Sequence, residues 1–483
     1  MNTKKITAIA LGSIKKLGAE YGDIRIVRRE QESIIVKNGK VEGINSSSSI
    51  GFGIRVLYNG YWGFASSNLM NTEEVEKIAK LAVNIAKASG TIRKEPLVLE
   101  PLKPLKDTWT SPYKIDPFSV SIEEKLDMLI GACIEMQKVP GIIIANATCS
   151  SFKEIKTFSS SEGRFITQTS VQAGAGIEAF SFNNGEVQKR SYPGAFGGDF
   201  ANAGWEFVKE MKLCDNARRI AEEAVALLSA PQCPAGELDI ILEGSQLALQ
   251  VHESCGHPIE LDRVFGTERS LAGTSFLTTE KLNKLKYGSK LVNITADATL
   301  KHALGSFGYD DEGIPAQKSY IVKNGVFVGY LTSRETAAKI GQKSNGTMRA
   351  DGHNRLPLIR MTSINLLPGK DSFENLVAGI KNGIYMETNK SWSIDDKRLN
   401  FQFACEIGWL IKNGKIKHMI KNPNYTGITP EFWGNCDGIT GKKEWKIWGV
   451  PNCGKGDPMQ TARVSHGVSR ARFRKVKVGV GKW

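Results

Sequence analysis

The chain has 483 residues, of which 41% are hydrophobic, 24% are charged and 8% are aromatic. This length predicts two or three domains, and the composition is typical of a soluble globular protein. It excludes a disulfide-stapled miniprotein and a disordered chain, and the sequence offers no apolar run of about 18 residues that would indicate a membrane span. The N-terminal apolar run is too short for a secretory signal, so we expect a cytoplasmic protein.

In chain order, the first half predicts helices and hairpins. Helices are expected over residues 6–19, over 72–88 behind a cap at Asn71, and over 121–137 behind a capping box at Ser121. β-rich runs occupy residues 23–28, 33–36, 51–58, 142–144, 163–169 and 176–182. The Asn-Gly pairs that follow some of these runs, at positions 38, 59 and 184, favour type I′ hairpin turns. A further helix is expected over residues 216–229.

A Pro/Gly-rich stretch at residues 230–236 predicts the domain boundary. After it come strand-rich segments with further Asn-Gly turns at positions 324 and 413 and few clear helices. We therefore expect an α+β protein. Its N-terminal α/β domain (residues 1–230) has antiparallel strands and hairpins, and its C-terminal domain (residues 231–483) is mostly β and barrel-like.

The net charge of +14 is spread along the chain except in the last fourteen residues, where basic residues meet no acid: Arg470, Arg472, Arg474, Lys475, Lys477 and Lys482. The same tail has the apolar alternation of a strand, with Phe473, Val476, Val478 and Val480. We predict a closing edge strand here, and a nucleic-acid-binding arm is the alternative. The eight cysteines form no Cys-x-x-Cys pair, which is typical of reduced thiols with at most one metal ligand among them.

The strongest chemical signal is His252-Glu253-Ser254-Cys255-Gly256-His257, which follows a predicted strand and helix start. Histidines at i and i+4 lie about 40° apart on a helix and reach one zinc ion, whereas the spacing here, i and i+5, separates them by about 140°. The motif therefore predicts a helix that stops or bulges. Gly256 tolerates unusual backbone angles, and Pro258 disfavours the α region for His257, so we expect His257 to swing back toward the metal from beyond the helix end.

Glu253 is predicted to be the general base that activates a metal-bound water. Nearby Glu260 and Asp262 are candidates for a third ligand, for acceptors of the imidazole N–H groups, or for plain surface acids. Spacing alone also leaves four other histidines and several thiols open as the third ligand. Those histidines are His302, His353, His418 and His466.

Several motifs together resemble the TldD branch of the TldD/PmbA metalloproteases, nearly from end to end. They are Gly51-x-Gly53-x-Arg55-Val56, His252-Glu253-x-x-Gly256-His257-x-x-Glu260-x-Asp262, Phe307-Gly308-Tyr309-Asp310-Asp311-Glu312-Gly313, Pro357-Leu358-Ile359-Arg360-Met361-Thr362 and Cys453-Gly454-Lys455-Gly456. The sister branch lacks the His-Glu-x-x-x-His motif, so this chain resembles the metal-bearing type. The resemblance implies that Cys453, in an irregular turn, is the third ligand. It also implies a peptidase for small or unfolded peptides that works as a dimer with an enclosed active site.

The resulting hypothesis is a zinc-dependent peptidase, with His252, His257 and Cys453 as ligands, Glu253 as base and no organic cofactor. Its partner in the dimer is an identical chain or a paralogue without the metal motif, and neither a membrane nor a nucleic acid is expected as a partner. The alternative, motivated by the basic charge, is a nucleic-acid- or gyrase-associated regulator with a non-catalytic metal. The acidic run Asp310-Asp311-Glu312 is expected to be structural or substrate-facing, and Arg360 to bind a peptide carboxylate or one of these acids.

Overall fold

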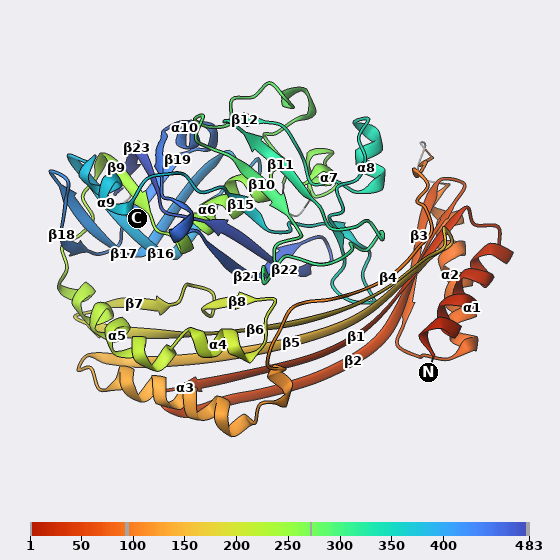
Figure 1. Cartoon of the computed structure of the whole chain (residues 1–483), viewed down its shortest axis with the longest axis horizontal. Helices are drawn as coiled ribbons and strands as arrows, with labels where there is room; N and C mark the ends of the chain where they lie inside the picture. The colour runs from red at the N-terminus through yellow and green to blue at the C-terminus, as the bar shows by residue number, and fades with distance from the viewer. Residues whose placement is uncertain (1, 92–95, 271–272, 480–483) are drawn as a thin grey trace.

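The computed structural model describes residues 2–91, 96–270 and 273–479, and it confirms the predicted α+β class. A long curved sheet forms the base of the molecule, and the C-terminal half lies over its inner face (Figure 1). Helices cover one end and the outer face of the sheet. No described helix has the length and apolar character needed to cross a membrane.

The curved sheet has the strand order β3-β2-β1-β5-β6-β4, with β7 and β8 also paired to β6. Its strands are β1 (Tyr21–Lys37), β2 (Lys40–Tyr58), β3 (Tyr61–Ser67), β4 (Leu105–Thr110), β5 (Ile142–Ser160), β6 (Arg164–Asn183), β7 (Glu186–Tyr192) and β8 (Asp199–Ala201). The runs predicted at residues 23–28 and 33–36 are therefore parts of one strand. The polar residues between them stay extended because β1 is paired on both sides along most of its length, to β2 and to β5.

The helices predicted over 72–88 and 121–137 begin at their predicted caps, whereas the helix predicted over 6–19 lies about three residues earlier. The helices of the first half are α1 (Thr3–Lys16), α2 (Thr72–Ser89), α3 (Ile122–Gln137), α4 (Trp205–Glu210) and α5 (Leu213–Ser229). Asn71 and Ser121 accept the backbone N–H of Glu74 and Glu124, as predicted. Helices α1 and α2 enclose one apolar core with β1, β2 and β3, and α3 to α5 enclose a second with β5 and β6. The five predicted Asn-Gly pairs all have positive φ at both residues, which confirms these turns.

The C-terminal half begins at β9 (Gly236–Leu242), after residues 230–235 that join it to α5. Five strands close a ring in the order β16-β9-β23-β19-β17, because β17 pairs back to β16. These strands are β16 (Asn382–Ile394), β17 (Asn400–Lys412), β19 (Asn424–Ile428) and β23 (Ala471–Val478), together with β9. The predicted barrel-like character of this half is thus confirmed.

Further elements surround the ring, and several of them contribute residues to its apolar core. The helices are α6 (Gly244–Val251), α7 (Leu261–Val264), α8 (Arg334–Lys339), α9 (Phe373–Ala378) and α10 (Thr429–Gly434). The strands are β10 (Ile294–Asp297), β11 (Lys318–Lys323), β12 (Val326–Phe327), β13 (Met348–Arg349), β14 (Leu358–Ile359), β15 (Ile364–Leu366), β18 (Lys415–Ile420), β20 (Cys436–Ile439), β21 (Lys446–Lys455) and β22 (Gln460–Val468).

The basic tail is a strand, as predicted, but the expectation of an edge strand is wrong. β23 lies between β9 and β19 and also pairs with β20, so it is interior to the sheet. The three arginines of the tail are paired with acids elsewhere in the sequence: Arg470 with Glu444, Arg472 with Asp437, and Arg474 with Asp437 and Asp239. Val480 and Lys482 lie outside the described residues.

Buried ion pairs join the curved sheet to the C-terminal half through the predicted acidic run. Arg55 of β2 contacts Asp23 of β1 at 2.7 Å and Glu312 at 3.4 Å, and the exposed fraction of each side chain is 4% or less. Asp311 pairs with Lys156 of β5 at 2.7 Å. These contacts give the acidic run a structural role at the junction between the two halves.

Replacing Arg55 by Met is expected to leave two buried carboxylates without their shared cation. Removing one partner of a buried pair costs about 3–5 kcal/mol of unfolding free energy, which urea denaturation measures. The matched control is Arg28→Met on the same sheet, whose side chain is 60% exposed and whose loss should change stability by less than about 0.5 kcal/mol. Equal, small effects of the two variants would contradict a structural role for this junction.

Candidate metal centre

The His-Glu-x-x-x-His motif starts at the end of helix α6, whose residues are all buried except Ser245. From His252 to Gly256 the helix widens into a π turn, in which the His257 N–H donates to the His252 carbonyl at 3.1 Å. This i→i+5 hydrogen bond absorbs the extra residue of the motif. It brings the two imidazoles together with 4.9 Å between ring centroids, so the predicted bulge is present.

The route by which His257 returns differs from the prediction. His257 has φ −71° and ψ −43°, which is α-helical, so Pro258 does not push it out of the α region. Gly256 is needed for space rather than for an unusual backbone angle, because a Cβ there would lie 2.2 Å from Met361 Sδ. The π turn therefore brings the two histidines of the motif together while the backbone stays helical.

Cys453 approaches the two histidines from β21, nearly 200 residues further along the chain. It lies in the paired strand at an irregularity of register between Val450 and Cys453, not in the turn that the sequence predicted. Its Sγ is 3.7 Å from His257 Nε2, and the ligand atoms of His252, His257 and Cys453 all lie within 4.8 Å of one another. This is the single such group found among the described residues.

The donor set fits a tetrahedral metal with one open position. Zn–N and Zn–S bonds of about 2.0 and 2.3 Å at tetrahedral angles place the two donor atoms about 3.5 Å apart, close to the 3.7 Å between Cys453 and His257. Burial acts to raise the pKa of the Cys453 thiol, but the two imidazoles and Arg360 outweigh it and hold that pKa well below its usual range. This lowering favours the thiolate, the form that binds metal.

Hydrogen bonds fix which nitrogen of His252 faces the metal position. His466 Nδ1 is 3.0 Å from the carbonyl of Ile364, which can only accept, so this nitrogen carries the proton. Burial holds the pKa of His466 well below its usual range, so its Nε2 is an acceptor, 2.8 Å from His252 Nδ1. His252 therefore donates from Nδ1 and keeps the lone pair of Nε2 for a metal. His466, one of the histidines left open as a third ligand, is instead a group that orients His252.

Glu260 orients His257 in the way that His466 orients His252. Its Oε2 accepts from His257 Nδ1 at 3.1 Å, which leaves Nε2 of this ring facing Cys453. Asp262 accepts from Lys455 at 2.7 and 2.9 Å. Of the three roles left open for these acids, the structure places Glu260 as an imidazole acceptor and Asp262 as a partner of Lys455, behind the site.

Glu253 is buried beside the two imidazoles and paired with Arg398, whose Nη1 donates to Oε2 at 2.6 Å. Burial acts to raise the pKa of Glu253, but His257, His252 and Arg398 lower it overall, so the carboxylate is ionised. Arg398 has a positive φ of 63°, an uncommon conformation for a long side chain. No spacing signal in the sequence indicated Arg398, which lies in the connection between β16 and β17.

Arg360 has a role that the sequence did not predict. It donates to the carbonyls of Cys453 and Gln460 and so ties β21 to β22 beside the thiolate. His302, His353 and His418 do not belong to the metal group. The geometry thus combines two imidazoles, one thiolate and an ionised carboxylate in one buried place.

Comparison with known proteins identifies the family. Residues 22–86, 115–228 and 235–480 match domain 1, the central domain and the C-terminal domain of the PmbA/TldA metallopeptidases. The chain belongs to the PmbA/TldD metallopeptidase family. A metalloprotease of Methanocaldococcus jannaschii is 32% identical over 90% of this chain and 92% of its own. A metalloprotease TldD homolog of Buchnera aphidicola is 27% identical over 87% and 85%.

Solved structures share the PmbA/TldD fold across the whole chain. The crystal structure of TldE from Thermococcus kodakarensis has a TM-score of 0.72 at 18% identity and covers 97% of this chain and 98% of its own. A Thermotoga maritima protein, described as a candidate modulator of a DNA gyrase, has a TM-score of 0.79 at 18% identity, with 99% and 100% covered. At this identity the likeness shows the fold alone.

Cys453→Ala is expected to reduce bound metal toward zero, because two remaining histidines hold zinc poorly. The measurement is metal analysis of the purified protein after dialysis. Cys255→Ala, within the motif but outside the ligand group, is the matched control and should retain the metal. A Cys453 variant that binds one ion as tightly as the parent would require a different third ligand.

His466→Phe is expected to weaken metal binding about 10- to 100-fold while the three ligands stay in place, because His252 loses its hydrogen-bond acceptor. A competition titration with a metal chelator measures this affinity. His418→Phe, on an exposed strand position, is the control and should leave affinity unchanged. Unchanged affinity in the His466 variant would show that His252 needs no orientation from it.

Proposed function

We propose that this chain is a zinc-dependent peptidase that hydrolyses small or unfolded peptides. The observation that carries the proposal is the convergence of His252, His257 and Cys453 with the ionised Glu253 beside them. Names of relatives support a metallopeptidase in general. The donor set of two imidazoles and a thiolate favours zinc among the common metals.

When bound, zinc would polarise the scissile carbonyl and lower the pKa of a water at the open position. Glu253 would accept the proton of that water during attack and pass it to the leaving amine. Arg398 holds Glu253 in place through the 2.6 Å contact. His466 and Glu260 fix the ring orientations of the two histidines, so the donor atoms need little rearrangement.

Burial of the site supports the substrate class. His252, Glu253, His257 and Cys453 each expose 5% or less of their surface. Such burial excludes the backbone of a folded protein, so the proposed substrates are small or unfolded peptides. The basic tail that motivated a nucleic-acid-binding alternative is an interior strand with paired arginines, and we do not propose that function.

Glu253→Ala should keep the metal and lose about 10²- to 10⁴-fold of turnover on an unfolded peptide, because the general base is removed. Turnover is followed by the appearance of new amino groups, with metal content measured on the same sample. Glu222→Ala, an exposed residue on α5, is the control and should match the parent. Near-parental turnover in metal-loaded Glu253→Ala would rule out this base.

A further inference from the structure

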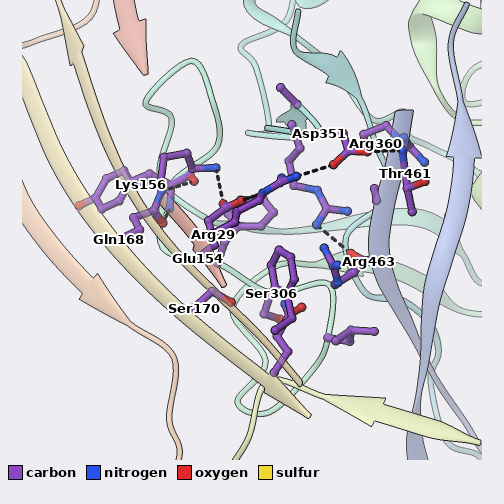
Figure 2. Close-up of a pocket in the computed structure, with 18 of the residues that line it drawn as sticks. Arg29, Glu154, Lys156, Gln168, Ser170, Ser306, Asp351, Arg360, Thr461 and Arg463 are labelled. Carbon is purple, nitrogen blue, oxygen red and sulfur yellow. Dashed lines mark hydrogen bonds and ion pairs between the residues drawn. The ribbon is translucent and has the colours of Figure 1, made fainter. Parts of the chain in front are cut away.

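A cavity of about 90 Å³ with several charged side chains in its lining lies between the inner face of the curved sheet and the C-terminal half. Strands β1, β4, β5 and β6 line it from the sheet, and β13 and β22 line it from the other side (Figure 2). Five basic side chains reach it but only two acidic ones. The basic residues are Arg29, Lys156, Arg349, Arg360 and Arg463, and the acidic residues are Glu154 and Asp351.

The two acids are already used by one arginine. Arg29 Nε contacts Glu154 at 2.7 Å, and its Nη1 contacts Asp351 at 2.7 Å, as the dashed lines in Figure 2 show. Lys156 is paired behind the cavity with Asp311 at 2.7 Å. No acidic residue in the lining of the cavity is therefore left to pair with Arg349, Arg360 or Arg463.

Arg349, Arg360 and Arg463 have no ion pair with any carboxylate in the described part of the chain. Arg349 donates to the carbonyls of Arg463 and Met361, and Arg360 donates to the carbonyls of Gln460 and Cys453. The Nε atoms of Arg349 and Arg360 are buried without a hydrogen-bond partner. Arg360 itself is 1% exposed.

Arg463 is the least engaged of the three. Its guanidinium lies 3.3 Å from the ring centroid of Phe152, and no hydrogen bond from it is found among the described residues. Burial, together with neighbouring arginines, lowers the pKa of both Arg349 and Arg463 to about 10. Arg360 lies beside the Cys453 sulfur, but Arg349 and Arg463 have no carboxylate within ion-pair distance among the described residues, so the cavity is suited to an anion.

The cavity is next to the metal centre. Thr461, Ala462 and Arg463 of β22 line it, and Ala462 is paired directly with Cys453 on β21. Arg360 contacts both the cavity and the carbonyl of Cys453. A peptide that reaches the metal centre therefore passes within one strand spacing, about 5 Å, of this cavity.

We propose that this cavity binds a carboxylate of the peptide substrate, with Arg463 as the main contact and Arg349 and Arg360 supplying the surrounding positive charge. Guanidinium groups match the planar, two-oxygen geometry of a carboxylate. Trp109, Phe152 and Phe307 give the cavity apolar walls for the carbon chain that carries this group. The inference rests on the proposed peptidase function and specifies its substrates as carboxylate-bearing peptides.

Two sources of this carboxylate are possible in a peptide: the free C-terminus and an Asp or Glu side chain. Three otherwise identical peptides separate them. One has a free C-terminus, one is amidated and neutral, and one is amidated with a single Glu. Whichever charged peptide has the lower KM identifies the source.

For the parent enzyme, at least one charged peptide should have a KM at least about tenfold below that of the neutral peptide, as expected for a charge-assisted hydrogen bond. Arg463→Gln should raise that KM to the neutral value and leave the neutral peptide unchanged, whereas Arg463→Lys should restore part of the difference. Arg28→Gln, an exposed arginine on β1, is the control. Metal content should be equal in all variants.

Equal KM values for all three peptides in the parent, or an Arg463→Gln variant that still discriminates, would overturn the inference. Hydrolysis of all three peptides in that case leaves the peptidase proposal intact. If the metal-loaded parent hydrolyses none of them, the peptidase proposal fails instead. The cavity is then tested independently by calorimetry, which measures binding of the free and amidated peptides to the Glu253→Ala protein. If this protein binds a charged peptide more tightly than the neutral one, and the Glu253→Ala/Arg463→Gln double variant does not, the carboxylate site is supported.

Discussion

The metal centre depends on one backbone hydrogen bond, from the His257 N–H to the His252 carbonyl. In a regular α-helix these two side chains would point about 140° apart, and no ion could contact both. The π turn removes this difference without breaking the helix. The neighbouring segment lies close against this turn, and Met361 occupies the space that a side chain at position 256 would need. The position of the π turn is therefore coupled to the positions of two other segments, which are the strand that carries Cys453 and the segment around Met361.

The sequence predicted those features that depend on neighbouring residues. The Asn-Gly turns, the caps at Asn71 and Ser121 and the bulge within the motif all follow from local chemistry. Strand lengths were underestimated, because the polar middle of β1 is held extended by pairing on both sides, which no local pattern reveals. The interior position of β23 was missed for the same reason.

The site was predictable only in part. His252, Glu253 and His257 share one motif, and a family resemblance supplied Cys453. The supporting residues Arg398, His466 and Arg463 come from distant strands or loops, and each acts through a contact made only in the folded chain. A histidine or arginine in isolation has no sequence signal that distinguishes these positions from ordinary surface or core positions. Charge balance within a cavity likewise becomes visible only when its whole lining is known.

The place of β23 in the ring has a consequence for biosynthesis. β23 is the last described strand, yet it lies between β9, the first strand of the ring, and β19. The ring therefore cannot close until β23 has been synthesised and has left the ribosome. Since Cys453 and His466 also come late in the chain, a nascent or truncated product has the histidine motif but neither the thiolate nor its orienting imidazole. A chain that ends before β21 therefore lacks one of the three donor atoms, and its metal centre cannot be complete.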